Sequence, residues 1–186
     1  MSLYAQLDQL ERCGIVPSEG TGIADFLARH SEREYETHPF RLLVSVLGEE
    51  SSDPPHGPLC DQLWHLRIGC IAGPGDYTRI ALRMATLAGQ SLAFSDVQEE
   101  FDSASGIVWL RFGLHGQQVS WPARIREQWV DPDVFSRFAA LLDAWDSPAR
   151  FTYLDLGGQD VLIGCVTPAQ FMEFRRRTGL RLEWLG

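Results

Sequence analysis

Three potential metal ligands, Cys60, His65 and Cys70, follow one another at intervals of five residues. Thiolate and imidazole groups bind zinc, but structural zinc sites usually bring their ligands in close pairs, about two to four residues apart. On a strand, an interval of five also places neighbouring ligands on opposite faces. The spacing therefore predicts structural residues, and we expect neither a metal nor another cofactor.

The segment Gly73-Pro74-Gly75-Asp76 precedes a predicted helix, which is where phosphate-binding loops occur. However, Thr78 stands where the dinucleotide-binding fingerprint has its third glycine, and no GK[ST] motif follows. Asp76 would also repel a phosphate. The segment therefore predicts a tight turn followed by a helix cap.

Nucleophilic sites are the third chemistry to consider, because their residues meet in space and not in sequence. The chain has no GxSxG motif, and none of its four cysteines carries a known catalytic signature. Most of its histidines lie in predicted loops or at segment ends, where surface histidines are common; they are His30, His38, His56, His65 and His115. We predict that the protein is not an enzyme. The alternative is an enzyme of unrecognised type, with a deep pocket that gathers a histidine or cysteine with carboxylates.

Carboxylates occur close together in two places. In a strand, Glu100 and Asp102 share one face while Glu99 points to the other, which predicts a solvated face and not a converging acid–base pair. Asp155 and Asp160 flank a Gly-Gly turn, where bonding to the local backbone is the expected role.

The most strongly patterned element is the stretch 106–124. Its apolar residues alternate on both sides of His115-Gly116, which predicts an antiparallel hairpin with a two-residue loop. In that register Val108 faces Ala123, Leu110 faces Trp121 and Phe112 faces Val119, so these six residues lie on one side of the hairpin.

Trp109 is not explained by this core, because it points away from Leu110 and lies beside Arg111. Either another element covers it, or it is an exposed aromatic residue next to an arginine, which is a composition typical of binding hot spots. Because the acidic strand 94–102 lies nearby, we predict a partner-binding surface here. Its residues are Asp96, Glu99, Glu100, Asp102, Trp109 and Arg111.

The remaining elements follow from apolar periodicity and capping residues. Helices are predicted over 2–13, 21–30, 38–48, 76–88 and 167–178, and from Asp131 onward with Pro132 as the first helical residue. In the helix 21–30 the inward positions are Ile23, Phe26 and Leu27. The segment 38–48 could instead be a buried strand. The segment 31–38 is predicted to be a polar linker. Strands are predicted over 94–102, 151–156, 161–166 and 180–185, with 63–71 ambiguous.

This order predicts an α+β fold: a largely antiparallel sheet, with the central hairpin 106–124, packed with helices after an N-terminal helical segment. We expect a single domain over residues 1–186. The alternative is a separate helical lobe at residues 1–50, bounded by the Pro-rich loop 49–58.

The formal net charge is -9, and every basic residue is arginine. Residues 1–105 hold 16 of the 25 acids and only 7 of the 16 arginines. This charge argues against direct binding of nucleic acid and fits either a solvated acidic face or a surface for a basic partner. The chain has no apolar run long enough to span a membrane, so we expect no membrane segment. Its N-terminus lacks the basic region followed by an apolar region that marks a secretory signal, so we expect a cytoplasmic protein.

Four stretches carry a resemblance: GDYTRIALRMATLAGQ, FDSASGIVWLRFGLHGQQVSW, WVDPDVFSRFAALL and TPAQFMEFRRRTGLRLEWL. Together they make up 70 of the 186 residues. The chain resembles the small acidic immunity proteins of bacterial polymorphic and type VI secretion toxin systems. The resemblance implies a cytoplasmic, non-catalytic antitoxin. Such a protein binds one secreted toxin, blocks its active site and protects the producing cell.

An inhibitory binding protein is therefore the first functional hypothesis, and its acidity would suit a toxin with a basic cleft, such as a nuclease or a nucleic-acid deaminase. The alternatives are a small regulatory or assembly module that acts as a homodimer through a sheet face, and the enzyme of unrecognised type.

Overall fold

The computed structural model describes residues 1–50, 58–102, 104–125 and 127–186. The loop predicted at 49–58 lies largely outside these residues, as does His56. Within the described residues, no helix combines the length and the apolar character that crossing a membrane requires.

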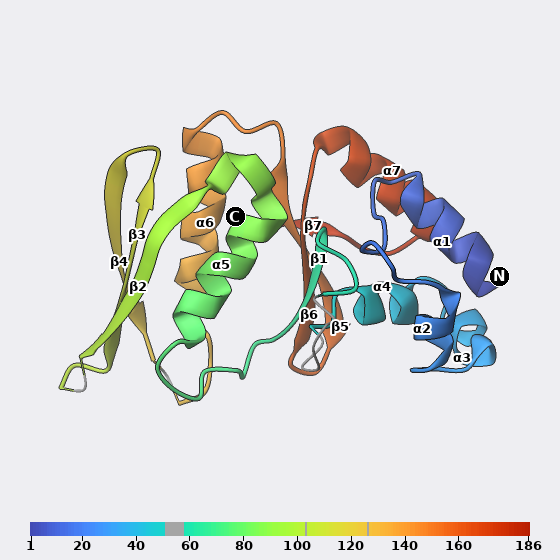
Figure 1. Ribbon diagram of the computed structural model, residues 1–186, viewed down its shortest axis with the longest axis horizontal. Helices are drawn as coiled ribbons and strands as arrows, with labels where there is room; N and C mark the ends of the chain where they lie inside the picture. Colours follow the sequence, from blue (N-terminus) through green and yellow to red (C-terminus); the bar gives the residue numbers. More distant parts are fainter. Residues whose placement is uncertain (51–57, 103, 126) are drawn as a thin grey trace. The chain divides into compact units, whose positions relative to one another are not determined.

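The chain divides into two compact units (Figure 1). Unit 1 comprises Met1–Leu66 and Phe151–Trp184, and unit 2 comprises Arg67–Arg150 and Leu185–Gly186. Helices and antiparallel sheets make up both, so the predicted α+β fold is confirmed. Residues 1–50 belong to unit 1, and the single domain expected over residues 1–186 stays a prediction.

Unit 1 begins with short helices: α1 (Leu3–Glu11), α2 (Ile23–Leu27), α3 (Glu32–Thr37) and α4 (Arg41–Leu47). The polar linker predicted at 31–38 is wrong, because Ser31 and Glu34 form a capping box that starts α3. On α2 only Phe26 is buried. The predicted inward positions Ile23 and Leu27 are 41% and 44% exposed.

The helix predicted over 38–48 is confirmed as α4, but it begins after Pro39, with Phe40 at a positive φ of 62° as its N-cap. The buried side chain of Gln6 holds the backbone of Phe40 in this conformation at the start of α4. Its Oε1 accepts the backbone N–H of Phe40 at 2.7 Å, and its Nε2 donates to the carbonyl of Tyr35 at 3.0 Å. One amide thus joins α1, α3 and α4.

The sheet of unit 1 has the order β1-β6-β5-β7. Its strands are β1 (Leu63–Arg67), β5 (Arg150–Gly157), β6 (Asp160–Val166) and the short β7 (Glu183–Trp184), and α7 (Pro168–Thr178) follows β6. The predicted capping box of α7 is confirmed, since Thr167 and Gln170 cap each other's backbone N–H groups. Helices and strands share one core, which includes Leu10, Phe26, Leu43, Leu47, Leu162, Phe171 and Phe174.

Unit 2 contains a three-stranded meander, β2 (Phe94–Asp102), β3 (Ile107–Leu114) and β4 (Gln117–Arg124), in the order β2-β3-β4. The predicted hairpin register is confirmed, because Val108 pairs with Ala123, Leu110 with Trp121 and Phe112 with Val119. His115 and Gly116 both have positive φ, 49° and 79°, as a type I′ turn requires.

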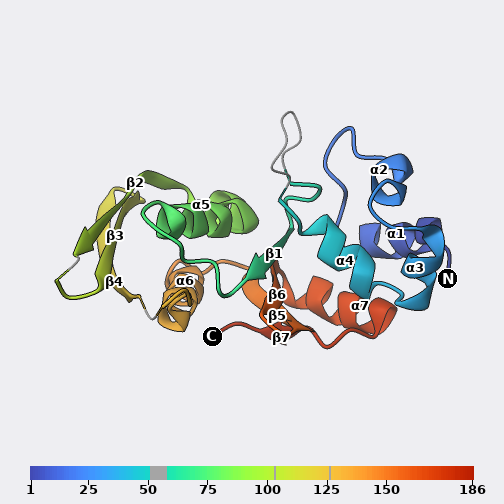
Figure 2. The ribbon, with the colours of Figure 1, turned by 90° about the horizontal axis from the view of Figure 1, so that it is seen from below.

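The helices of unit 2 are α5 (Asp76–Ala88), the 3₁₀-helix η1 (Gly89–Leu92) and α6 (Pro132–Ala144). Asp131 caps α6 and Pro132 is its first residue, as predicted. Both α5 and α6 lie on one side of the three-stranded sheet (Figure 2). On that inner face Phe138 of α6 lies 5.1 Å from Trp121 and 6.3 Å from Phe112, between ring centroids. The aromatic cluster therefore holds α6 against the sheet.

A charged cluster joins α7 to α1 in unit 1. Arg177 donates to Oε1 of Gln9 at 2.6 Å, and Arg176 donates to Oε1 of Glu173 at 2.6 Å. The hydrogen bond from Arg176, with a further one from Arg177, holds the pKa of Glu173 at about 2, below its ordinary value of 4.5.

This pKa predicts how the cluster responds to acid. Because the folded-state pKa is depressed, the contribution of Glu173 to stability is present above its ordinary value of 4.5 and is lost as the pH falls toward about 2. The difference in free energy of unfolding between wild type and Glu173→Gln should therefore shrink over that range, as measured by denaturation at each pH. A difference that stays constant from pH 5 to pH 2 would contradict the assignment.

Candidate functional site

The face of the three-stranded sheet opposite α5 and α6 is here named the outer face. Cross-strand pairing arranges its side chains in rows, since residues directly opposite each other share a face. The central row is Glu100–Trp109–Pro122, and the rows beside it are Gln98–Arg111–Ser120 and Asp102–Ile107–Arg124.

Trp109 lies at the centre of the outer face, on the central strand, and is 36% exposed. Nη1 of Arg111 lies 2.8 Å from Oε2 of Glu100, so an ion pair borders the indole. Of the two alternatives for Trp109, the structure shows the exposed one. It brings these three predicted residues together as one contiguous set.

Two other predicted residues lie at the borders of this set. Asp102 shares the outer face, but its carboxylate accepts from the Ser105 hydroxyl at 2.6 Å and from the backbone N–H of Ala104 at 3.0 Å. The Ser105 bond lowers the pKa of Asp102 and closes the turn between β2 and β3. Asp96 is exposed where the register of β2 shifts, with a positive φ of 50°.

Glu99 does not belong to the outer face. It points to the inner side, where its carboxylate accepts from the backbone N–H of Gly75 and from that of Thr78 at 2.8 Å. These N–H groups begin α5, so Glu99 is an anion at a helix N-terminus. Glu99 is therefore a structural residue, which corrects its assignment to the same surface as Glu100.

The Gly-Pro-Gly-Asp segment forms the predicted tight turn and cap. Gly75 is the N-cap of α5 with a φ of 100°, and Asp76 is the first helical residue and not the cap itself. Oδ2 of Asp76 accepts from the N–H groups of Ala72 and Gly73 at 2.7 and 2.9 Å. Carboxylates of the protein thus occupy the position that a phosphate-binding loop would offer to its ligand.

The acidic surplus of the chain lies elsewhere. On the outer face Glu100 and Asp102 are balanced by Arg111 and Arg124. In contrast, α2 and α3 of unit 1 carry four exposed carboxylates and one exposed arginine: Asp25, Glu32, Glu34 and Glu36, with Arg33. A basic partner surface would therefore be attracted mainly to unit 1.

A second polar constellation, in unit 1, was not predicted. Ser45 of α4, His65 of β1 and Asp160 at the start of β6 form a chain of contacts: Oγ of Ser45 lies 3.2 Å from Nδ1 of His65, and Nε2 of His65 lies 3.3 Å from Oδ1 of Asp160. The sequence predicts bonding to the local backbone for both Asp155 and Asp160. Asp155 does accept from the backbone N–H of Gly157, whereas the Asp160 carboxylate contacts His65. No sequence spacing indicates this group, because its members lie 20 and 95 residues apart.

Ser45 also lines a hollow of about 260 Å³ in unit 1. The other lining residues are His38, Arg41, Leu42 and Leu156. Nη2 of Arg41 donates to the carbonyl of Leu156 at 2.6 Å, which holds the guanidinium at this wall. The hollow therefore places a serine hydroxyl, a cation and apolar surface together.

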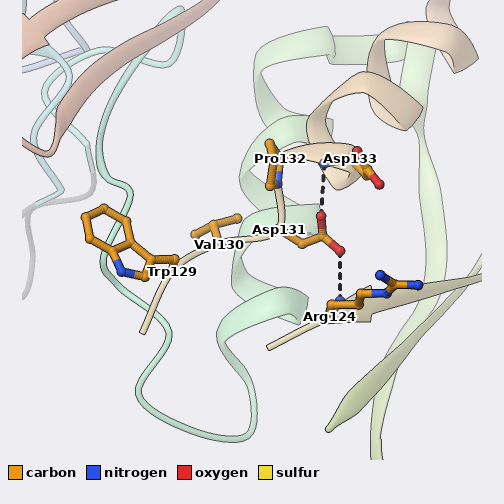
Figure 3. A pocket seen from close by; sticks show the side chains of 6 residues that line it. All are labelled: Arg124, Trp129, Val130, Asp131, Pro132 and Asp133. Carbon is orange, nitrogen blue, oxygen red and sulfur yellow. Dashed lines mark hydrogen bonds between the residues drawn. The ribbon is translucent and has the colours of Figure 1, made fainter. Parts of the chain in front are cut away.

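A larger hollow of about 420 Å³ lies in unit 2 (Figure 3), lined by Arg124, Trp129, Val130, Asp131, Pro132 and Asp133. The Asp131 carboxylate accepts from the backbone N–H groups of Arg124 and Asp133 at 2.8 and 3.1 Å. It is thus engaged in fixing α6 to the end of β4. These described lining residues include neither a nucleophile nor a histidine, so the hollow does not form a catalytic constellation.

Metal ligands do not gather among the residues that the structure describes: no group of three or more His, Cys, Asp or Glu side chains is placed to hold an ion. Cys60 and His65 belong to unit 1, whereas Cys70 belongs to unit 2. The four cysteines form no disulfide, and burial raises the pKa of Cys165 to about 12, so this thiol stays protonated at neutral pH.

No protein-family model matches the chain, and no curated protein and no solved structure is significantly similar to it. The geometry of the two units therefore carries the functional argument.

The neighbouring residues Glu99 and Glu100 offer a matched test of the two faces. Glu99→Ala removes two hydrogen bonds at the start of α5 and should lower the free energy of unfolding by about 1–2 kcal/mol. Glu100→Ala removes an exposed ion pair and should change it by less than about 0.5 kcal/mol. Chemical denaturation measures both, and equal losses would contradict the structural role of Glu99.

Proposed function

We propose that the protein is a bacterial immunity protein that binds one cognate toxin, blocks its active site and acts in the cytoplasm without catalysing a reaction on that toxin. The observation that supports this proposal is the exposed Trp109 at the centre of the outer face, beside the Arg111–Glu100 ion pair. Tryptophan and arginine are the residues most enriched in binding hot spots.

The surroundings of Trp109 fit an interface. Ile107 and Pro122 extend the apolar centre, and the polar residues Gln98, Arg111 and Ser120 lie beside it. An apolar centre with a polar rim is the usual arrangement of protein interfaces. Three strands about 4.8 Å apart and about eight residues long give a face of about 400 Å². A stable complex needs about 800 Å² per partner, so we expect the contact to continue beyond the sheet.

The charge supports a toxin with a basic surface. With a net charge of -9, the protein attracts a basic partner over long range, which raises the rate of association more than the final affinity. A toxin that acts on nucleic acid carries such a surface. The same charge disfavours direct binding of nucleic acid by the immunity protein.

The outer face also favours a second candidate, a regulatory or assembly module that acts as a homodimer. Its apolar centre, made of Ile107, Trp109 and Pro122, can pack against the same face of a second copy in a two-fold symmetric interface. Light scattering tests this candidate. A molar mass that doubles as the protein concentration rises would support the homodimer over the first candidate, provided that Trp109→Ala abolishes the doubling.

The primary test is co-expression with the protein encoded immediately upstream. We expect a one-to-one complex on co-purification and rescue of growth from the toxicity of that protein. Trp109→Ala should weaken the complex by about 2 kcal/mol or more, roughly 30-fold in Kd, because a hot-spot side chain is lost. Trp184→Ala, at a tryptophan with a similar exposure of 39%, is the control and should leave Kd unchanged.

Absence of both complex and rescue would overturn the immunity proposal for that pair. If the complex forms but Trp109→Ala and Trp184→Ala bind equally, the immunity function would stand and the outer face would be the wrong surface.

A further inference from the structure

With His65 as a neutral imidazole, Ser45, His65 and Asp160 have one direction of proton donation. An ionised carboxylate can only accept a hydrogen bond, so the contact of Asp160 requires a proton on Nε2 of His65. In a neutral imidazole the other nitrogen, Nδ1, is then an acceptor. Consequently the hydroxyl of Ser45 donates to Nδ1 across 3.2 Å.

This is the direction of an activated serine: hydroxyl to imidazole, and imidazole to carboxylate. The two ring nitrogens exchange roles relative to the usual triad, in which the serine contacts Nε2. In this arrangement Nδ1 can take the hydroxyl proton while Asp160 stabilises the imidazolium through Nε2–H.

A purely structural role explains these contacts poorly. Serines inside helices commonly bond back to the carbonyl of the preceding turn, but Ser45 instead turns to His65. Buried polar groups need partners because they have lost water, whereas the Asp160 side chain is 44% exposed and that of His65 is 21% exposed. Solvent reaches the Asp160 carboxylate, so this carboxylate does not need His65 to replace lost water.

Of the three residues only Ser45 lines the hollow described above, so the hollow would receive the group that Ser45 attacks while His65 contacts Ser45 from outside the lining. The volume of the hollow, about 260 Å³, is below the roughly 300–1,000 Å³ of pockets for drug-sized ligands, so it admits a small group. Leu42 and Leu156 give it apolar walls that suit a short acyl chain. Arg41 lies one helical turn before Ser45 and can face the negative charge that develops on a carbonyl oxygen.

We propose that Ser45, His65 and Asp160 form an acyl-transfer site that hydrolyses short-chain carboxylic esters, an activity separate from toxin binding. Oγ of Ser45 attacks the ester carbonyl while its proton passes to Nδ1 of His65. The bond to the leaving alkoxide then breaks, and His65 returns the proton to that oxygen. Water attacks the acyl-serine in the same way, which releases the carboxylic acid and restores Ser45.

The proposal is tested with the full-length protein and p-nitrophenyl butyrate. The wild type should release nitrophenolate above the buffer rate, and Ser45→Ala and His65→Gln should each lower kcat by about 100-fold or more. Ser91→Ala is the matched control, because Ser91 also engages a side chain through its hydroxyl, that of Ser147 at 3.1 Å, but lies in unit 2. This control should retain wild-type kcat.

Asp160 is a positioning residue, and its test separates kcat from KM. Asp160→Asn should lower kcat while KM stays within about twofold, because the carboxylate acts on His65 and not on the ester. A change in KM alone would contradict this role.

A second measurement does not depend on folding of the variants. A fluorophosphonate ester should modify the wild-type protein at Ser45, located by mass spectrometry of its peptides. Hydrolysis at the buffer rate together with no label at Ser45 would overturn the proposal, as would equal activity of wild type and a folded Ser45→Ala. Because Ser45→Ala leaves Trp109 intact, it should still protect cells from the toxin, so the two functions fail separately.

Discussion

The register of the β2-β3-β4 sheet is the constraint on which unit 2 depends. Side chains alternate between faces, so a slip of one residue would place Leu110 and Phe112 in solvent and Trp109 in the core. The type I′ turn at His115-Gly116 and the aromatic contacts of Phe138 with Phe112 and Trp121 enforce the same pairing. The core and the outer face are therefore two results of one register.

The same alternation separates the two adjacent glutamates. Glu100 meets Arg111 on the outer face, while Glu99 meets the free N–H groups at the start of α5. The carboxylate of Glu99 stabilises the helix that covers the inner face, and that cover leaves the opposite face available for a partner. A structural charge and a surface charge thus come from neighbouring positions.

Unit 1 is organised by polar contacts between segments that are distant in sequence. Gln6 links the short N-terminal helices, and His65 links α4 to the start of β6 through Ser45 and Asp160. The exposed carboxylates of α2 and α3 lie in this unit and not on the outer face. Long-range attraction and close contact would therefore use different parts of the chain in the proposed immunity function.

The sequence alone determined the features that depend on local geometry. Alternation predicted β2, the hairpin register and the outward direction of Trp109, and capping residues predicted α6 and α7. Only the tertiary structure decided that Glu99 binds the N–H groups at the start of α5, that Ile23 and Leu27 stay exposed, and that Ser45, His65 and Asp160 meet. The reason is physical: periods and caps act over a few neighbouring residues, whereas these contacts join elements that only packing brings together.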